Sequence, residues 1–496
     1  MKLTATTRDS GKVLTSVNPA TGEHIAEHHV HTTDEVRAAV AAARAAAQLW
    51  AAASFDERKN AILKWVSYLN RHADDLTELM HLENGKPIED AYFELVVALG
   101  DIDWAAKHVK GALSPKRVNP GLLMANFAAT VEYRPLGVVG VIGPWNYPIA
   151  TPAGSIAYAL AAGNTVIFKP SEYATSIGNW LAASFADANA DLPANILKTV
   201  NGHGETGAAL VSAGVDKIAF TGSTTTGKKI MAAAAETLTP VVLECGGKDA
   251  AIIADDADVK RAAKEVAWAA MSNSGQTCVG VERIYVHKAI RDEFVAELYE
   301  QLKDVRAGKD YGPMTMPSQV DVVTRHVDDA LRNGGTALLG GLHCIRPPYI
   351  DPIVLTDVAE QSAAVQEETF GPTVTIRTVD GVDEAVDLAN ATRYGLASTV
   401  YSRGQGMQVA RKLRAGATSV NAALAAGAIS ALPFGGVGDS GIGRIHGEEG
   451  LREFARSHSI ARQRFSIPGL TLMSFNRSPL MMKAVKQAVN LLYGRH

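Results

Sequence analysis

The chain has 496 residues, of which 47% are hydrophobic and 20% are charged, and its formal net charge is −4. A chain of this length can bury a large core and is expected to form more than one domain. The small negative charge gives no field that would attract nucleic acid, and no basic and aromatic residues interleave as base stacking would require. The composition therefore predicts a globular protein with no nucleic-acid partner.

The three cysteines, at positions 245, 278 and 344, form neither a CxxC pair nor an even disulfide framework. This usage favours a reducing compartment. The first residues lack the apolar run of a signal peptide, and no window approaches the roughly 20 apolar residues of a membrane span. We therefore expect a cytoplasmic protein with free thiols.

The N-terminal part of the chain is predicted to be mainly helical and to serve as scaffold. Alternation over 23–30 predicts a strand, and Thr32 to Glu35 has the Thr-x-x-Glu form of a capping box. Helices are predicted at 36–52, 57–70, 74–82 and 88–113. The histidines at positions 24, 28, 29 and 31 alternate between strand faces without a carboxylate cluster, so we predict no metal site.

From residue 132 the pattern changes to alternating strands and helices. The run 136–142, Leu-Gly-Val-Val-Gly-Val-Ile, is typical of a parallel strand that is buried on both faces. Further strands are predicted at 165–168, 196–200, 217–220 and 241–243, with helices at 150–162, 175–188, 207–212 and 224–236. Repeated βα units of this kind predict a doubly wound parallel sheet with ligands at the carboxyl ends of its strands.

A second α/β pattern extends from about residue 249 to residue 434. It contains predicted strands at 283–286 and 374–379. Its predicted helices lie at 291–305, 318–333, 382–389 and 407–413. Because this pattern follows a complete set of βα units, the fold class is α/β with two α/β lobes.

Four short segments carry side chains suited to chemistry. Cys278 lies in the small, polar segment Ser-Asn-Ser-Gly-Gln-Thr-Cys-Val-Gly, although a lone cysteine is more often a buried small hydrophobe. Glu244 precedes a glycine pair, Asn146 lies in Gly-Pro-Trp-Asn-Tyr-Pro, and Phe-Thr-Gly-Ser ends at Ser223. Taken singly, these three residues could be a surface acid, a turn residue and a helix N-cap.

Together these four segments resemble the aldehyde dehydrogenase superfamily, and the resemblance extends from about Asn18 to Arg462. It implies a Rossmann-like NAD-binding domain (1–117 and 136–245), a catalytic domain (246–434) and a small β oligomerisation arm (118–135 and 453–464). It also implies a homodimer or homotetramer. Two residues depart from the family pattern: Cys245 replaces an apolar residue, and Ile445 stands where many tetrameric relatives carry a second glutamate.

The resemblance assigns roles to three catalytic residues. The Cys278 thiolate would add to an aldehyde carbonyl, giving an alkoxide that can lose hydride to nicotinamide. The Asn146 amide and the Cys278 backbone N–H would hold the alkoxide oxygen. Glu244 would activate the water that hydrolyses the resulting thioester. Relatives that transfer the acyl group to coenzyme A generally lack this glutamate, so we expect a carboxylic acid product.

The resemblance also implies a dinucleotide site. The helix N-terminus after Gly222 favours a pyrophosphate, and Lys169 and Glu172 can hydrogen-bond ribose hydroxyls. Because an anionic Glu172 would repel a 2′-phosphate, we expect NAD, with NADP as the less favoured cofactor. The expected cofactor residues are Ile142, Trp145, Lys169, Ser171, Glu172, Gly204, Gly222, Ser223, Gly227, Glu368 and Phe370.

Tyr147 and Phe434 are the expected substrate residues. The segment 421–434 resembles the family's substrate-mouth loop and has no charge, whereas an anionic semialdehyde would need a cation. We therefore expect apolar aldehydes, aliphatic or aromatic. Three alternatives stay open: a semialdehyde dehydrogenase, a coenzyme A-acylating enzyme, and a catalytically silent dinucleotide-binding protein of the same fold.

The last part of the chain, 465–496, is a basic tail. No acidic residue follows Glu453, whereas seven Lys and Arg do. Ser478-Pro479 predicts a helix start and Gly494 a helix end, and Met481, Val485, Ala488, Val489 and Leu492 would share one face. Such a helix can cover its own subunit or a partner, or lie on an anionic membrane surface.

Overall fold

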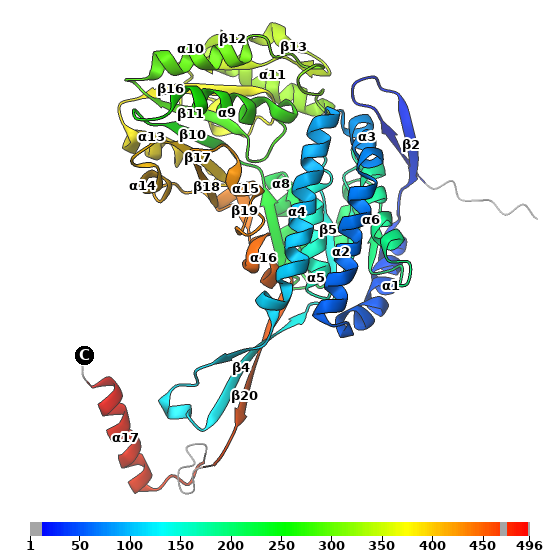
Figure 1. The fold of residues 1–496 in the computed structure, drawn as a ribbon, viewed down its shortest axis with the longest axis vertical. Helices are drawn as coiled ribbons and strands as arrows, with labels where there is room; N and C mark the ends of the chain where they lie inside the picture. The colour runs from blue at the N-terminus through cyan, green and yellow to red at the C-terminus, as the bar shows by residue number, and fades with distance from the viewer. Residues whose placement is uncertain (1–11, 467–473, 495–496) are drawn as a thin grey trace, which may run out of the picture. The chain divides into compact units, whose positions relative to one another are not determined.

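The structure is a computed structural model that describes residues 12–466 and 474–494. It divides into two compact units (Figure 1). The first unit, Met1–Ala112 with Pro135–Ala455, contains two largely parallel sheets and the helices that cover them. The second unit, Leu113–Arg134 with Arg456–His496, contains a small sheet and the C-terminal helix.

A β-hairpin and four helices open the first unit. The hairpin pairs β1 (Val13–Val17) with β2 (His24–His29), and the helices are α1 (Thr33–Ala52), α2 (Phe55–Arg71), α3 (Ala73–Asn84) and α4 (Ile88–Leu113). The predicted capping box is confirmed, because the Thr32 N–H donates to Glu35 Oε2 over 2.7 Å and the Glu35 N–H donates to Thr32 Oγ1. The hydrogen bond from the Thr32 N–H to the carboxylate, together with one to His29, lowers the pKa of Glu35 to about 2.

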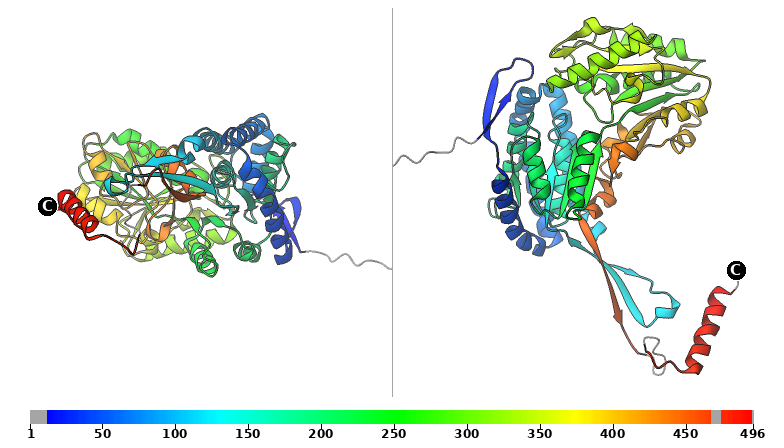
Figure 2. Two further views of the ribbon diagram at one scale, coloured as in Figure 1. Left: turned by 90° about the horizontal axis from the view of Figure 1, so that it is seen from below. Right: turned by 180° about the vertical axis from the view of Figure 1, so that it is seen from behind.

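The first large sheet has six strands in the order β19-β9-β8-β5-β6-β7. All neighbours are parallel except β19 and β9. Helices cover both faces, seen from one side in Figure 1 and from the other in Figure 2. The strands are β5 (Val138–Ile142), β6 (Thr165–Lys169), β7 (Leu197–Thr199), β8 (Lys217–Gly222), β9 (Val241–Cys245) and β19 (Gly441–Ile442), and the helices between them are α5 (Ala150–Ala161), α6 (Thr175–Ala188), α7 (Gly204–Ser212) and α8 (Thr224–Ala235).

The order of these strands confirms the doubly wound prediction. From β5 the chain adds β6 and β7 on one side and then β8 and β9 on the other. The direction of winding therefore reverses between β5 and β8, and in open α/β sheets ligands bind at the carboxyl end of such a switch point. The segment that carries Asn146 follows β5, and Ser223 follows β8.

Two strands extend further than the sequence predicts. β8 and β9 each continue two residues beyond their predicted ends, because Thr221 and Gly222 pair with Glu244 and Cys245. On its other side Glu244 is paired with Gly441 of β19. Glu244 is therefore a residue of an interior strand, not of a surface turn.

The second large sheet has seven strands in the order β12-β15-β16-β11-β10-β17-β18. Alternate residues of β10 enter two different cores: Ala251 and Ile253 pack with α9 and α10, and Ala250 and Ile252 pack with α13 and α14. The strands are β10 (Asp249–Ile253), β11 (Val281–His287), β12 (Thr336–Leu339), β15 (Ile353–Thr356), β16 (Thr373–Val379), β17 (Ala397–Tyr401) and β18 (Ala417–Val420); the main helices are α9 (Val259–Met271), α10 (Arg291–Leu302), α11 (Pro317–Arg332), α13 (Val382–Ala389) and α14 (Gly406–Ala410).

The second unit contains a sheet of three strands in the order β20-β4-β3. These strands are β20 (Ala455–Gln463), β4 (Phe127–Pro135) and β3 (Lys116–Val118). Helix α17 (Pro479–Tyr493) begins and ends where the sequence predicts, with Ser478 as N-cap and Gly494 as C-cap. Within the described ranges, no helix combines the length and the apolar character that crossing a membrane requires.

Candidate active site

Cys278 lies on a tightly constrained loop between α9 and β11. Asn273, Ser274 and Gly275 are all left-handed, with φ of 52°, 58° and 66°. A Cβ on Gly275 would lie 2.1 Å from the carbonyl oxygen of Gly371, so only glycine fits there. Ser274 Oγ donates to the Gly312 carbonyl over 2.6 Å, which holds one of the strained residues in place.

The structure brings Asn146 and Tyr147 to this loop. The side-chain amide of Asn146 donates to the carbonyl of Gln276 over 2.9 Å. The Tyr147 hydroxyl and Thr277 Oγ1 lie 2.9 Å apart. Asn146 is buried, and Cys278 is only partly buried. The predicted nucleophile and the predicted oxyanion donor are therefore on two segments that are hydrogen-bonded to each other.

A buried ion pair that the sequence analysis missed positions the Asn146 segment. Lys86 Nζ contacts the Glu94 carboxylate, and it also donates to the Asn146 carbonyl over 3.0 Å. The other Glu94 oxygen accepts hydrogen bonds from the N–H groups of Ile149 and Ala150, over 2.8 and 3.0 Å. The only signal in the sequence is a lysine and a glutamate eight residues apart around the start of a helix, which resembles an ordinary surface pair.

Glu244 is a buried carboxylate with an unusual pKa. Neither of its oxygens has a full hydrogen bond, although the Cys278 thiol and the Thr221 hydroxyl lie close enough to act on it. Burial raises its pKa to about 7, and these two neighbours limit the rise. A carboxylate with this pKa can accept a proton near neutral pH.

The Cys278 thiol lies among carboxylates. Burial raises its pKa well above the ordinary value for cysteine, and the charges of Glu244, Asp249 and Glu368 raise it further. The thiol is therefore neutral at neutral pH in this arrangement. The Glu244 charge acts on the thiol more strongly than those of Asp249 and Glu368, so Glu244 is the best-placed group to accept the thiol proton.

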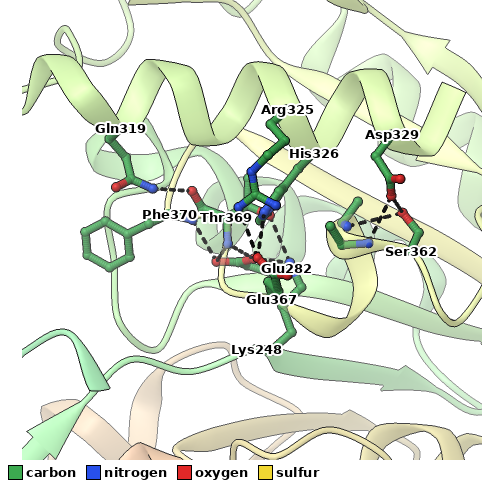
Figure 3. A network of polar contacts seen from close by, with 12 residues as sticks. Lys248, Glu282, Gln319, Arg325, His326, Asp329, Ser362, Glu367, Thr369 and Phe370 are labelled. Atoms are coloured by element: carbon green, nitrogen blue, oxygen red, sulfur yellow. Dashed lines mark hydrogen bonds and ion pairs between the residues drawn. The ribbon is translucent and has the colours of Figure 1, made fainter. Parts of the chain in front are cut away.

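A second buried network holds the backbone of Thr369 and Phe370 (Figure 3). Glu282 pairs with Lys248 and accepts hydrogen bonds from the backbone N–H groups of Thr369 and Phe370, over 2.9 and 3.0 Å. Phe370 has a left-handed backbone, with φ of 52°, and its ring points away from these charges. Its ring lies edge-on to that of Trp145, with centroids 5.5 Å apart.

Glu368 lies against the glycine pair that follows Glu244. Its Oε1 accepts a hydrogen bond from the Gly247 N–H over 3.1 Å, and a Cβ on Gly246 would come within 2.1 Å of its Oε2. Burial, and then the charge of Glu282, raise the pKa of Glu368 to about 8. Two of the expected cofactor residues thus lie close to other expected site segments: Glu368 contacts the glycine pair after Glu244, and Phe370 contacts Trp145.

The remaining expected cofactor residues gather at the carboxyl edge of the first sheet. Ser223 is the N-cap of α8 and accepts a hydrogen bond from the Thr226 N–H, so it has the capping role that the sequence left open. Lys169 is buried, and its Nζ lies 3.6 Å from Glu172. The others are Ile142 at the end of β5, Ser171 after β6, Gly204 at the start of α7, Gly222 at the end of β8 and Gly227 in α8.

The residues that depart from the family pattern have structural roles here. Cys245 packs beneath α8, where a Cβ on Gly227 would lie 2.8 Å from its sulfur, and burial raises its pKa to about 12. Ile445 is buried and exchanges backbone hydrogen bonds with Phe434. Phe434 lies beside His446, with ring centroids 5.9 Å apart. In the described part of the chain no group of three or more metal-ligating side chains is found.

The expected substrate loop reaches the neighbourhood of Cys278. Val279, the residue after the thiol, lines a small pocket together with Leu424, Ala426 and Gly427 of the uncharged segment. Asp249 contributes to the same pocket. Asp249 does not stand out in the sequence, because an acid at the start of a short apolar strand resembles a strand-end surface residue.

The family model for the aldehyde dehydrogenase family matches residues 6–460. The chain belongs to the aldehyde dehydrogenase family. It is similar to the crystal structure of a Mycobacterium tuberculosis aldehyde dehydrogenase complexed with NAD⁺, with 31% identity, a TM-score of 0.86 and coverage of 92% of this chain and 96% of that one.

Two curated relatives are also similar. One, from Mycobacterium ulcerans, carries a provisional name as an NADP⁺-dependent succinate-semialdehyde dehydrogenase; it is 36% identical, and the match covers 90% of this chain and 87% of that protein. The other is the 4,4′-diapolycopene aldehyde oxidase of a Methylomonas species, which is 35% identical with 92% and 87% coverage. The predictions of family, α/β fold and NAD(P)-dependent aldehyde dehydrogenase activity are confirmed.

The buried pair Lys86–Glu94 provides a test of how Asn146 is positioned. We expect Lys86→Met to destabilise the protein by about 3–5 kcal/mol, because it leaves Glu94 buried without a countercharge. The double variant Lys86→Met/Glu94→Gln should recover much of the apparent Tm. Its kcat/KM should stay lower on the order of 10²-fold, because the Asn146 carbonyl has lost its donor. Recovery of activity in step with Tm would contradict this positioning role.

Proposed function

We propose that this enzyme oxidises apolar aldehydes, aliphatic or aromatic, to carboxylic acids, with NAD as hydride acceptor and Cys278 as nucleophile. The first sheet and its helices would bind the dinucleotide, and the second would supply the thiol. The observation that carries the substrate class is the uncharged loop segment 421–434, part of which lines a small pocket with Val279, the residue after Cys278. The three acidic side chains that act most strongly on the thiol, Glu244, Asp249 and Glu368, offer no cation to an anionic substrate.

This environment disfavours an anionic substrate. A semialdehyde brings its own carboxylate, which would have to be desolvated without a cation to offset the cost. The loop segment that shares a pocket with Val279 carries no charge to compensate it. An apolar aldehyde has no carboxylate to desolvate and needs no compensating charge.

Exposed aromatic side chains on the helices that lead to the site support the same class. Phe93 on α4 and Trp268 on the last turn of α9 pack edge to face, with ring centroids 6.1 Å apart, and both remain about half exposed. Tyr92 and Val96, which lie near Phe93 in α4, are also exposed. Helix α9 runs directly into the Cys278 loop, so a hydrocarbon chain near the thiol would have apolar surface on which to pack.

The chain's own groups support an acyl-enzyme route. Glu244 takes the proton from the Cys278 thiol, and the thiolate sulfur forms a bond to the carbonyl carbon as the carbonyl π electrons move to oxygen. The Asn146 amide and the Cys278 backbone N–H hold this oxygen. Bound NAD would supply the acceptor for the hydride that leaves the carbon, which produces a thioester on Cys278. Glu244 then loses the thiol proton to solvent and takes a proton from water, whose oxygen forms a bond to the thioester carbon. The carbon–sulfur bond breaks, the acid leaves, and the thiolate takes back the proton from Glu244.

The residues present fit a dinucleotide. The N-terminus of α8 presents unpaired backbone N–H groups and a positive dipole end, which suit a pyrophosphate. Burial lowers the pKa of Lys169, and the adjacent Glu172 partly offsets this effect. The two side chains lie 3.6 Å apart at the end of β6, where both can hydrogen-bond ribose hydroxyls. The carboxylate of Glu172 supports NAD over NADP.

The proposal includes assembly as a homodimer or homotetramer and a cytoplasmic location. β20 is an edge strand of the small sheet, and most of its residues are exposed. An exposed edge strand offers unpaired backbone groups to a second chain, which supports a homodimer or homotetramer. The absence of a disulfide framework from the sequence supports a cytoplasmic location.

The substrate class can be tested with a series of aldehydes. We expect kcat/KM to rise by about fourfold for each added methylene from propanal upward, until the apolar surface is filled. Benzaldehyde should be a good substrate, and succinate semialdehyde should be poorer than butanal, its uncharged counterpart of equal chain length. A preference for succinate semialdehyde, as in the name of the Mycobacterium ulcerans relative, would favour the second candidate function, a semialdehyde dehydrogenase.

The role of Glu244 can be tested by its pH dependence and by pre-steady-state kinetics. Glu244 must be ionised to accept a proton, so kcat should fall as pH decreases through about 7. Glu244→Gln should release NADH slowly, up to about one per active site, and then stop, because the thiol has lost its base and the thioester is not hydrolysed. Cys278→Ala should give no NADH at all, with any aldehyde.

Two results would contradict this assignment. Sustained turnover of Glu244→Gln after addition of coenzyme A would indicate acyl transfer rather than hydrolysis. Binding of NAD without turnover by the unchanged enzyme across the aldehyde series would indicate a catalytically silent protein.

The cofactor preference depends on Glu172. We expect Glu172→Ser to raise kcat/KM for NADP by about tenfold or more, because the carboxylate no longer repels the 2′-phosphate. The kcat/KM for NAD should fall, because a hydrogen bond to the ribose is lost. Both values are measured on the same preparation, so NAD is the internal control. An unchanged ratio of the two would show that Glu172 does not set the preference.

A further inference from the structure

The second unit carries a charge opposite to that of the rest of the chain. Leu113–Arg134 and Arg456–His496 hold ten of the 48 Lys and Arg but only one of the 52 Asp and Glu, Glu132. The unit therefore has a net charge of +9 in a chain of −4, which leaves −13 on the remainder. Segregation on this scale is typical of a region that binds a polyanionic surface.

Helix α17 concentrates apolar surface within this basic unit. Its ends are fixed by local sequence, with Ser478 as N-cap, Pro479 in the first turn and Gly494 as C-cap. Lys483, Lys486, Gln487 and Asn490 form a narrow polar stripe along one side. The rest of the helix is apolar, and Leu480, Leu491 and Tyr493 are 81%, 72% and 65% exposed.

This helix needs a surface on which to pack. A helix of 15 residues is marginal in water by itself, because most helical stability in proteins comes from packing an apolar face. Met481 is the one buried residue among those of α17, so the described chain leaves most of that face uncovered. Phe475, which precedes the helix, is also exposed.

We propose that α17 binds in the plane of an anionic lipid bilayer surface. The helix is about 22 Å long at 1.5 Å per residue, shorter than the roughly 30 Å hydrocarbon core, so it lies on the membrane and does not cross it. Its broad apolar face enters the acyl boundary, and Lys483 and Lys486 meet the phosphates of the headgroups. Charge complementarity favours an anionic lipid surface, because no acidic residue lies between Glu453 and the end of the chain.

The attachment is independent of the proposed substrate class. It would hold the enzyme at a membrane whatever aldehyde it oxidises. Failure of membrane binding would leave the reaction untouched, and failure of the substrate prediction would leave the membrane site untouched.

Sedimentation with lipid vesicles tests the proposal on the full-length protein. We expect the protein to sediment with vesicles of phosphatidylcholine and phosphatidylglycerol in equal parts, but not with phosphatidylcholine alone. Lys483→Glu/Lys486→Glu should weaken binding by at least about 30-fold, the loss expected for two lysines near an anionic surface. Leu480→Ser/Leu491→Ser should weaken it by about tenfold or more for each leucine.

Lys64→Glu/Lys309→Glu is the matched control. It makes the same change of charge on the first unit, at two exposed lysines whose carboxylate partners are 3.8 Å away. We expect this variant to bind vesicles like the unchanged protein. All variants should oxidise a water-soluble aldehyde normally, which shows that they are folded.

Three outcomes would overturn the proposal. The first is no binding of the unchanged protein to either vesicle, and the second is equal binding of the α17 variants and the control. The third is a change of oligomeric state in the α17 variants, measured by light scattering, without any loss of vesicle binding. That result would make the apolar face an interface with a second copy of the chain.

Discussion

A buried carboxylate, neutralised by a lysine, fixes the backbone on each side of the site. Glu94 pairs with Lys86 and accepts hydrogen bonds from two consecutive N–H groups, those of Ile149 and Ala150. Glu282 pairs with Lys248 and does the same for Thr369 and Phe370. A carboxylate can satisfy a cation and two backbone donors at once, and leaving any of these buried groups unpaired would be costly. The two segments are therefore held at defined positions without regular secondary structure.

The same desolvation that makes these pairs rigid sets the chemistry between them. Glu244 has no lysine partner among the residues that the structure describes, so burial leaves its pKa near neutrality instead of near 4.5. Glu368 is in the same situation, with a single backbone donor, and its pKa is raised further. The contrast between paired and unpaired carboxylates separates structural acids from acids that can exchange protons. It also explains why the thiol of Cys278, surrounded by the unpaired acids, depends on a base to be activated.

The sequence predicts the first sheet better than the second. The β-branched runs of β5 and β6 and the bounds of α4, α6 and α13 stand out by hydrophobic pattern and are confirmed. Strands β17 and β18 were missed, because Ala, Ser and Thr give them little hydrophobic contrast. Cys278, Asn146 and Glu244 are proposed from short motifs, whereas the pairing of Lys86 with Glu94 and of Lys248 with Glu282 depends on tertiary contacts that local sequence does not encode.

The pairing of Gly441 with Glu244 has a consequence for biosynthesis. The last strand of the first sheet comes from a segment almost 200 residues after its neighbour, and it follows the whole second sheet along the chain. On the ribosome, therefore, an emerging chain can build most of both lobes while this edge of β9 has no strand beside it. Until residue 442 has left the exit tunnel, the backbone of Glu244 cannot pair on this side. The strand that carries the proposed base thus gains its last neighbour as one of the final events of its own synthesis.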